Sequence, residues 1–394
     1  MRRTMGACLA GALILLSGCQ GADDDGAAKK AASAAPPEIS VTPADGAADV
    51  SPTTPVEISV TGGTFDEATV VDQDGTKVEG KVAESQDEAG VEVWTPTDPL
   101  AYGNSYTLTA KAAGKDKGAK GATATASFTT VTPTQETTPS IGPLGGTTVG
   151  VGMPIRVYFD QPVADKAAVE SHLSVDSSHP TDGVWSWLSD TEVHFRPSTY
   201  WPADTDVTVH ADLYGVDLGD GVWGEKDREV AFHIGAKHVS IADAATHVID
   251  VYDGDTLVQS YPMSAGSQAN PSHNGAHVVL ESFRTITMDS STFGLAVDAP
   301  GGYRTDVEYA VRISNNGEFV HAAPWSVAQQ GNANVSHGCI NLSVDRAAWF
   351  YGFAIPGDVV EIKNSIGPPL SRADGDIYDW TIPWDQWKAG SALS

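Results

Sequence analysis

The sequence has little cysteine and little positive charge. Only three cysteines occur among 394 residues, which excludes a scaffold held together by several disulfides. Lys and Arg total 23 against 51 Asp and Glu, so the formal net charge is −28. A nucleic-acid-binding protein needs a basic face toward the phosphates, and nucleic acid is therefore excluded as a partner. The acidic residues are spread along the chain, which indicates a solvated surface.

The sequence also lacks an apolar run long enough to cross a membrane. The run from Met5 to Leu16 follows a basic start, Met1 to Arg3, and is shorter than the ~20 residues that a spanning helix needs. This pattern predicts a signal peptide over residues 1–18. The four residues Leu16 to Cys19 resemble a bacterial lipobox, which implies cleavage before Cys19 and attachment of lipid to its thiol. The alternative is an ordinary signal peptide with an incidental cysteine.

This processing would leave Cys339 as the only thiol of the mature chain, because Cys8 leaves with the signal peptide and Cys19 carries the lipid. A free thiol outside the cytoplasm is exposed to oxidation, which favours a chemical role for it. Residues 19–37 are rich in Ala, Asp and Pro and predict a flexible tether. We therefore expect an extracytoplasmic protein held at the outer face of the cell membrane by a lipid on Cys19.

Two stretches of about 100 residues each show the period-2 alternation that is typical of β-strands. The segment Thr54–Val60 recurs as Met153–Phe159, 99 positions later, and Val93–Ala110 recurs loosely as His194–Ala211 with a shift of 101. Identities differ, but the apolar alternation is kept. We predict two tandem immunoglobulin-like sandwiches without the usual disulfide, over residues 38–132 and 137–236, with a linker near 132–140.

From residue 237 the pattern changes. Residues 238–267 predict a β-hairpin that turns at 253–255, and residues 343–354 predict a helix with Ser343 as its N-cap. A third, β-rich domain is expected over 237–364. The last segment, 365–394, holds three Trp within eight residues; we interpret it as an arm packed on this domain, in preference to a sugar-binding platform. The predicted fold is mostly β throughout.

The residues around Cys339 form a candidate catalytic constellation. If the chain there is a strand, His337, Cys339 and Asn341 share one face, because side chains two apart point the same way. Gly338 would allow close approach of a substrate, and the amides of Gly338 and Cys339 would face an oxyanion. His321 ends another strand-like segment 18 residues earlier. A nearby His lowers the pKa of a thiol and later carries its proton.

Three interpretations stay open from the residues alone. Cys339 is a buried structural cysteine, or it forms a zinc site with His321 and His337, or it is a nucleophile. Zinc would accept these ligands, but no second cysteine or acidic ligand lies at a familiar spacing. Two further histidines, His273 and His277, lie in a segment rich in Gly and Asn and are weak evidence for a metal site. Nucleophilic catalysis is the interpretation that we favour.

A family resemblance makes this interpretation specific. His321, a gap of fourteen residues and then Ser336 to Asn341, Ser-His-Gly-Cys-Ile-Asn, resemble the signature of the L,D-transpeptidase (YkuD-type) family. The wider chain is similar to the mycobacterial-type multidomain form of that family, which has a lipid or membrane anchor, two immunoglobulin-like domains and a Trp-rich C-terminal arm. The resemblance is sharp over residues 238–364 and architectural elsewhere. It implies a YkuD-like catalytic domain that two spacers lift from the membrane toward the cell wall.

The resemblance also implies a role for each matching residue. Cys339 would be the nucleophile, and His321 the general base, oriented by the backbone carbonyl of Ala322. His337 and Gly338 would shape an oxyanion pocket with the Cys339 amide.

Other matching positions would bind substrate or hold the loop. Segments 288–294 and 300–305 resemble a lid over the site. Phe293 stands where several relatives have Tyr, so a hydroxyl contact is missing or replaced there. Ser336 and Asn341 would hold the nucleophile loop by hydrogen bonds. The substrate-binding positions so implied are Met288, Phe293, Tyr303, Trp325, Ser336 and Asn341.

The implied reaction is acyl transfer between peptidoglycan stem peptides. The thiolate attacks the carbonyl between the third and fourth residues of a tetrapeptide stem, D-Ala leaves, and a side-chain amine of a second stem closes a 3→3 cross-link. The family implies no metal or organic cofactor, and acylation of the cysteine by carbapenems. We expect a monomer. Alternatives are hydrolysis or protein attachment at the same site, or a noncatalytic wall-binding lipoprotein.

Overall fold

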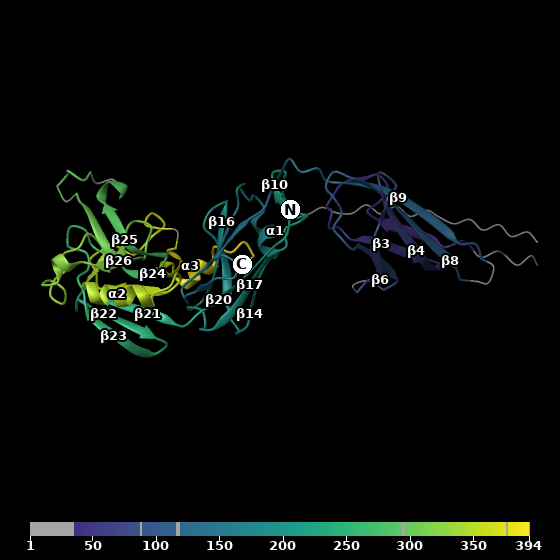
Figure 1. The fold of residues 1–394 in the computed structure, drawn as a ribbon. Helices are drawn as coiled ribbons and strands as arrows, with labels where there is room; N and C mark the ends of the chain where they lie inside the picture. The colour runs from purple at the N-terminus through teal and green to yellow at the C-terminus, as the bar shows by residue number, and fades with distance from the viewer. Residues whose placement is uncertain are drawn as a thin grey trace, which may run out of the picture.

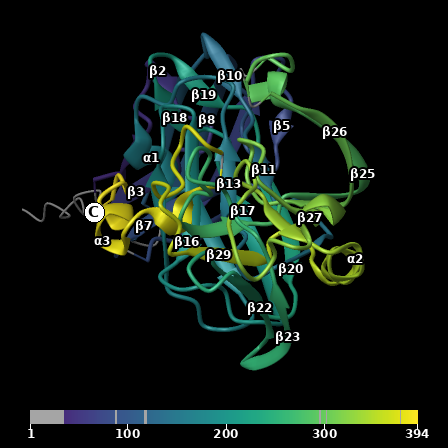
Figure 2. The same ribbon diagram turned by 90° about the vertical axis from the view of Figure 1, so that its left-hand side faces the viewer.

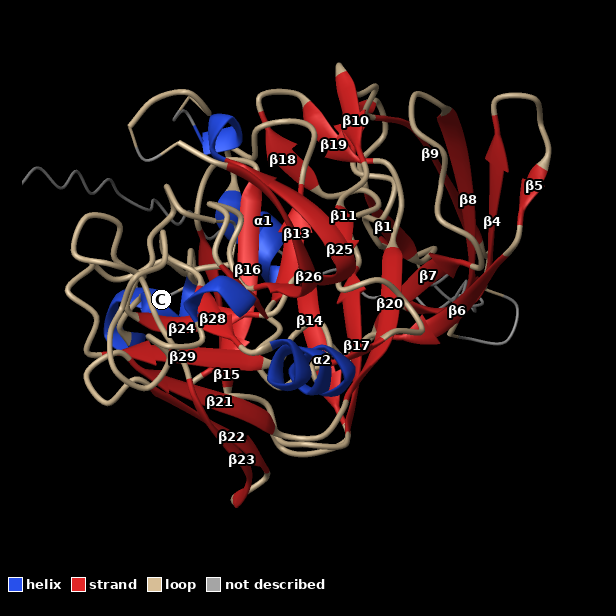
Figure 3. Ribbon diagram, turned by 60° about the vertical axis from the view of Figure 1, so that its left-hand side comes forward, coloured by secondary structure: helices blue, strands red, loops and turns tan. Residues whose placement is uncertain are grey.

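The computed structural model describes residues 35–393, except 87–88, 116–118, 294–295, 301 and 376. The predicted signal peptide, the lipidation site Cys19 and residues 19–34 of the predicted tether lie outside the described residues. Among the described residues, no helix is both long and apolar enough to cross a membrane. Three β-rich units follow one another along the molecule, and the C-terminal segment returns from the third unit to the middle one (Figure 1). Strands dominate each unit, and helices are few and short (Figure 3).

The first unit is a sandwich of two sheets. Its core lies between them and is built from alternating side chains such as Ile58, Trp94 and Leu108, which are nearly inaccessible to solvent. The first sheet has the order β1 (Glu38–Thr42), β3 (Val56–Thr61), β7 (Val91–Pro96), β6 (Gly80–Glu84). The second has the order β2 (Ala47–Val50), β9 (Ala122–Thr130), β8 (Ser105–Gly114), β4 (Gly63–Asp72), β5 (Lys77–Val78).

The second unit repeats this plan. One sheet has the order β11 (Ser140–Gly142), β13 (Ile155–Tyr158), β16 (Glu192–Pro197), β15 (Gly183–Trp187). The other has the order β12 (Thr148–Val149), β20 (Arg228–Ile234), β17 (Thr205–Ala211), β14 (Leu173–Ser177). A small third sheet joins β10 (Gln135–Thr137), β19 (Val222–Gly224) and β18 (Asp217–Gly219), and the one α-helix of this unit is α1 (Lys166–Ser171).

The internal repeat predicted from the sequence is confirmed by strand order. β3 and β13 hold the same place beside β7 and β16, and β2 and β12 each pair in parallel with the closing strand. Trp94 and Phe195, which the repeat aligns, are both buried. One prediction was wrong in detail: residues 135–137 of the expected linker form β10, because their backbone groups pair with β19, which lies about 87 positions further on.

The third unit packs two sheets and one helix around a core of its own. Its first sheet has the order β23 (Thr256–Pro262), β22 (Val248–Asp253), β21 (His238–Asp243), β29 (Val359–Lys363), β24 (Gly275–Val278). Its second has the order β25 (Glu281–Asp289), β26 (Arg304–Arg312), β27 (Phe319–Ala322), β28 (Ile340–Leu342). The predicted hairpin is β22–β23, and the predicted helix is α2 (Val344–Phe353) with Ser343 at its N-cap. Apolar residues of both sheets meet Ala347 and Phe350 of α2 in this core.

The C-terminal arm bridges the second and third units. It contains η3 (Asp379–Thr381) and α3 (Trp384–Lys388). The guanidinium of Arg196 lies over Trp380, Trp384 and Trp387, with its carbon 4.8, 5.1 and 4.6 Å from the ring centroids. Trp387 is fully buried. The prediction that these Trp side chains pack on the body is confirmed, but they pack largely on the second sandwich and not on the third unit alone.

Direct backbone contacts also join these two units. The amides of Gly150 and Gly152 donate to the carbonyls of Pro356 and Gly357, each at 2.8 Å. Val278 and Val359 of the third unit belong to the same buried cluster as the core of the second sandwich. The third unit therefore packs on the second sandwich through a continuous apolar contact.

Candidate active site

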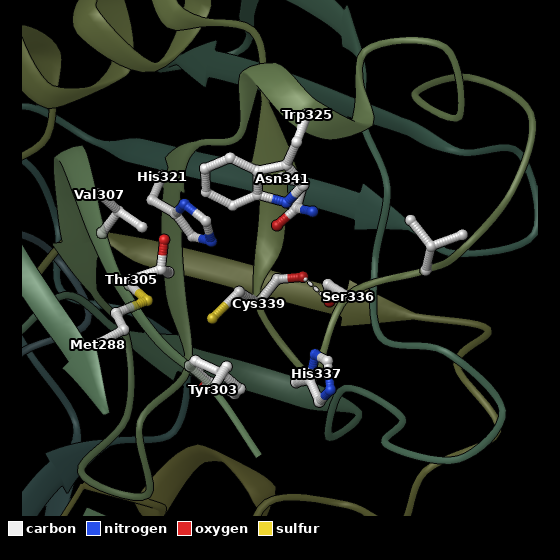
Figure 4. A pocket seen from close by; sticks show the side chains of 11 residues that line it. Met288, Tyr303, Thr305, Val307, His321, Trp325, Ser336, His337, Cys339 and Asn341 are labelled. Carbon is white, nitrogen blue, oxygen red and sulfur yellow. Dashed lines mark hydrogen bonds between the residues drawn. The ribbon is translucent and has the colours of Figure 1, made fainter. Parts of the chain in front are cut away.

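Two short parallel strands bring the predicted base and nucleophile together. β27 carries His321 and pairs with β28, which follows Cys339 directly, in the register Val320↔Ile340 and His321↔Asn341. The chain between them turns through η2 (Pro324–Ser326) and a loop. His321 and Cys339 consequently line the same pocket, as their sequence spacing predicted (Figure 4).

The pocket has a volume of about 360 Å³ and is walled by eleven side chains. Eight of these were predicted from the sequence: Met288, Tyr303, His321, Trp325, Ser336, His337, Cys339 and Asn341. Three were missed: Thr305, Val307 and Val335. The strand alternation of β26 could have pointed to Thr305 and Val307, because they share a face with Tyr303. Gly338 does not line the pocket, and the side chain of Phe293, which ends η1 (Ser290–Phe293), lies outside the described residues.

The expected strand through residues 335–342 was wrong for its first half. Regular pairing begins only at Ile340, and Gly338 has φ = +118°, a conformation that glycine adopts and other residues rarely do. His337, Cys339 and Asn341 do reach one pocket, but through a turn in the chain and not through simple alternation. The turn arises because Ser336 pairs with Gly266 and not with β27.

The imidazole of His321 is fixed in orientation by its neighbour. Nδ1 lies 2.8 Å from the carbonyl oxygen of Ala322 and must donate to it, which leaves Nε2 unprotonated as a base. This is the role that was expected of the Ala322 carbonyl. Burial lowers the pKa of His321 to about 4, against a smaller opposing effect of the Ala322 carbonyl. The indole of Trp325 lies beside the ring, with centroids 6.1 Å apart.

The thiol of Cys339 is buried and points between His321, Met288 and Tyr303 (Figure 4). Sγ donates to the carbonyl oxygen of Gly317 at 3.6 Å. Burial raises the pKa of Cys339 to about 12, although a hydrogen bond from the Phe319 amide favours the thiolate. The expectation that His321 lowers this pKa was wrong, because burial penalises both ionised forms and keeps the pair neutral.

Hydrogen bonds hold the loop that carries Cys339, as predicted for Ser336 and Asn341. Ser336 Oγ donates to the Cys339 carbonyl at 2.6 Å and accepts from the Gly338 amide at 3.1 Å. Asn341 Nδ2 donates to Ser326 Oγ at 3.1 Å. Because the Gly338 amide is engaged by Ser336, it is not available to an oxyanion; this leaves the Cys339 amide of the two that were expected there.

A long hairpin of β25 and β26 curves out from the body of the third unit (Figure 2). Met288 and Tyr303 lie where this hairpin meets the loop that carries Cys339, and the ring of Tyr303 lies 5.0 Å from that of His337. Ser290 and Tyr303 tie the two arms of the hairpin together through bonds of 3.0 and 2.9 Å. Burial raises the pKa of Tyr303 to about 12, so its hydroxyl is neutral and able to donate.

A second hollow of about 460 Å³ adjoins the first. It shares Met288 and Tyr303 with the first pocket, and Gly317, whose carbonyl accepts from Cys339, forms part of its wall. Asp289 and Arg312 give it a more polar character than the first pocket. The two hollows are therefore neighbours that share the side chains of Met288 and Tyr303.

The zinc alternative required His321, His337 and Cys339 to converge on one point. Across residues 35–393, leaving out the gaps named above, no three side chains of His, Cys, Asp or Glu are placed so that they could share a metal ion. The arrangement is that of a thiol and an imidazole in an apolar pocket, which suits nucleophilic acyl transfer.

Comparisons with known proteins agree with this chemistry. The family described as L,D-transpeptidase catalytic domain, YkuD, matches residues 237–362, and the bacterial Ig domain family matches residues 47–217. L,D-transpeptidase 2 of Mycobacterium tuberculosis is 40% identical over 90% of this chain and 85% of its own length. L,D-transpeptidase 5 of the same species is also 40% identical, over 91% of this chain and 77% of its own.

Among solved structures, LD transpeptidase LdtMt1 in complex with imipenem is 36% identical to this chain and superposes with a TM-score of 0.51. That structure covers 58% of this chain and is itself covered completely.

Proposed function

Because the chain belongs to the L,D-transpeptidase family, we propose that it cross-links peptidoglycan 3→3, using Cys339 as the nucleophile. The observation that carries the proposal is the pairing of two neutral groups in one pocket. His321 has its Nδ1 proton committed to Ala322, so that Nε2 is a base, and Cys339 presents its thiol in the same pocket. A neutral thiol and a neutral base can exchange a proton during attack without a charged resting state.

The first step forms a thioester. Cys339 rotates from the Gly317 carbonyl toward His321, Nε2 takes the proton from Sγ, and sulfur attacks the carbonyl carbon between the third and fourth stem residues. The amide of Cys339 donates to the oxyanion of the tetrahedral intermediate. The intermediate collapses when the C–N bond breaks, and His321 returns the proton to the departing amine of D-Ala.

The second step releases the enzyme. A side-chain amine of a second stem attacks the thioester carbonyl, and His321 accepts a proton from that amine. The C–S bond then breaks, and His321 gives this proton to the departing sulfur, which regenerates the neutral thiol and the neutral imidazole. The two neighbouring hollows would receive the two stems. The apolar pocket next to His321 suits the donor, and the more polar hollow with Asp289 suits the amine of the acceptor.

The anchor and the two sandwiches are proposed to place this site outside the cell. A lipid on Cys19 would hold the protein at the outer face of the membrane, and the immunoglobulin-like units would carry the catalytic unit toward the wall as a monomer. Replacing Cys19 by Ala should release the protein into the soluble fraction, and continued membrane attachment of that variant would remove the lipid anchor from the account.

The reaction is tested on the chain from Glu38 onward with a disaccharide-tetrapeptide. We expect a dimer one D-Ala lighter than two monomers by mass spectrometry, and no dimer with Cys339→Ala. A shortened monomer without a dimer would favour the hydrolytic alternative. If the wild-type protein forms neither the dimer nor the shortened monomer, the noncatalytic wall-binding alternative is favoured.

Carbapenem acylation is the second part of the proposal. LdtMt1 has been solved in complex with imipenem, and we propose that imipenem acylates Cys339 here. Ring opening of the β-lactam adds the whole drug to the thiol, so the protein should gain the mass of one imipenem, which Cys339→Ala should not gain.

A further inference from the structure

A buried loop lies directly behind the nucleophile. Ser272, in the connection from β23 to β24, is fully buried, and its hydroxyl has two partners. Oγ donates to the carbonyl oxygen of Gly338 at 2.6 Å and accepts from the amide of Gly266 at 2.9 Å. Ser272 does not line the catalytic pocket. It contacts the residue that precedes the nucleophile from the interior side.

The geometry of one peptide unit connects this hydroxyl to the chemistry. In a trans peptide the C=O and the N–H point in opposite directions. The carbonyl of Gly338 and the amide of Cys339 belong to the same peptide, and the carbonyl is turned toward buried Ser272. The amide of Cys339 is therefore turned away from the interior, toward the side on which the thiol lies. Within the described part of the chain, this amide donates no hydrogen bond.

The orientation of this peptide needs a restraint, because glycine does not supply one. Gly338 has φ = +118° and no side chain to exclude other conformations. The Ser336 hydroxyl holds the peptide before Gly338, and the Ser272 hydroxyl holds the peptide after it. Without the second bond, the Gly338–Cys339 peptide could rotate and withdraw its amide.

A buried carboxylate fixes the loop that carries Ser272. Glu318 accepts from the amide of His273 at 2.9 Å and meets His273 Nδ1 at 3.2 Å and His277 Nε2 at 3.0 Å. A Cβ atom on Gly338 would lie 3.4 Å from its Oε1. Glu318 immediately precedes β27, the strand that carries His321. One carboxylate thus ties the Ser272 loop to the start of the strand that carries His321, and it lies next to Gly338.

We propose that Ser272, braced by Glu318, is a positioning residue that aims the Cys339 amide at the oxyanion of the acyl-transfer intermediate. The proposal rests on the proposed function, since it concerns the same reaction. It assigns a role to two residues outside the pocket and separates the aiming of the oxyanion donor from the reactivity of the thiol.

Two reagents distinguish these contributions. Imipenem reacts at a carbonyl and forms an oxyanion, whereas iodoacetamide reacts at a saturated carbon and forms none. Ser272→Ala should slow imipenem acylation about 10- to 100-fold, because loss of an oxyanion donor costs about 100- to 1000-fold and a misaimed donor somewhat less. Alkylation by iodoacetamide should stay within about twofold of wild type.

Ser365→Ala is the matched control. Its hydroxyl donates to the backbone carbonyl of Ser272 at 2.6 Å from the segment after β29, so the variant loses a hydroxyl of the same size that contacts Ser272 but keeps the bond to Gly338. We expect wild-type rates with both reagents. Glu318→Gln is a second variant in case Ser272→Ala does not fold. It should slow acylation by imipenem, because the Ser272 loop loses its brace. It should not slow alkylation by iodoacetamide, because the Glu318 charge raises the pKa of Cys339 and its removal favours the thiolate.

The proposal is overturned if imipenem acylates the Ser272→Ala variant at the wild-type rate. It is also overturned if the variant reacts more slowly with both reagents by the same factor, because the effect would then lie in the thiol or in folding. The same two results for Glu318→Gln would overturn the bracing role. If imipenem does not modify wild-type Cys339 at all, the proposed function fails and this inference falls with it. The two failures are distinguished by the wild-type reaction.

Discussion

Nδ1 of His321 lies 2.8 Å from the carbonyl oxygen of Ala322. The next residue along the chain therefore selects the tautomer of the base, and it does so with a backbone atom that every residue type possesses. A side-chain hydroxyl is not needed at position 322 for this purpose. The consequence is that Nε2 carries the lone pair on the side of the ring that remains for the thiol.

Replacing His321 by Gln should remove the base while retaining a polar side chain of similar length. General-base catalysis contributes about 100- to 10,000-fold, so imipenem acylation should slow by a factor in that range. In the wild type, the pKa of His321 near 4 predicts a flat acylation rate between pH 5 and 7. Stopped-flow measurement of acylation checks both. An acylation rate that decreases as the pH is lowered through 6.5 would indicate an ordinary solvated histidine and contradict the burial argument.

Alkylation of Cys339 should show no plateau in the usual thiol range. Burial raises its pKa to about 12, so the thiolate fraction grows about tenfold for each pH unit up to that value, whereas an exposed thiol levels off above its pKa of about 8.5. The rate with iodoacetamide should rise steadily from pH 7 to pH 10. A plateau near pH 8 or 9 would show that the resting thiol is solvated or already paired with a cation.

Gly338→Ala should impair acylation because position 338 requires a positive φ of 118°. A non-glycine residue held in such a region costs on the order of 1–3 kcal/mol, and the chain would relax by turning the neighbouring peptides. We expect an acylation rate at least about 10-fold lower. Gly352→Ala is the control: it lies in α2, where the new methyl group meets nothing within 4 Å, and alanine favours helix. Equal behaviour of the two variants would contradict the strain argument.

The contact between His194 and Asp379 predicts a pH dependence of arm docking. Burial opposes a charge on His194, but the carboxylates of Asp379 at 2.8 Å and Glu192 at 3.0 Å outweigh it and raise the pKa of His194 to about 8. A raised pKa stabilises the fold fully below pH 6.5, and this contribution, about 2 kcal/mol, is lost as the pH rises through 8.

Asp379→Asn should remove most of that contribution. Urea unfolding followed by Trp fluorescence at pH 6 and pH 9 measures it, because three Trp side chains surround Arg196 in the arm contact. The variant should be less stable than wild type at pH 6 and closer to it at pH 9. A stability gap that is the same at both pH values would mean that His194 is not charged in the folded protein.

Local patterns in the sequence predicted most of the fold. Alternation located the strands, and the repeat between Val93–Ala110 and His194–Ala211 predicted two related sandwiches, because each repeat carries its own core-facing residues. Long-range pairing could not be predicted. β10 depends on β19, and the docking of the arm depends on Arg196, which lies about 190 positions before the Trp side chains that cover it. The domain boundaries stay a prediction.

The candidate site was predicted where a motif is contiguous and missed where it is not. The six residues from Ser336 to Asn341 and the spacing to His321 pointed to five of the pocket residues, and the wider family resemblance pointed to three more, Met288, Tyr303 and Trp325. The conformation of Gly338 was not foreseen, because we assumed that strand alternation continues through residues 335–342, where the structure has a turn. Ser272 and Glu318 carry no local signal, since their importance arises from a contact with Gly338 made by tertiary folding.

The central claim is that Cys339 forms an acyl-enzyme with a peptidoglycan tetrapeptide stem. Intact-protein mass spectrometry after brief incubation with a disaccharide-tetrapeptide tests it most directly. The account predicts a protein heavier by the disaccharide-tripeptide acyl group, with the adduct mapped to Cys339 and absent from Cys339→Ala. An adduct of the same mass on Cys339→Ala, or cross-linked product formed by that variant, would contradict it.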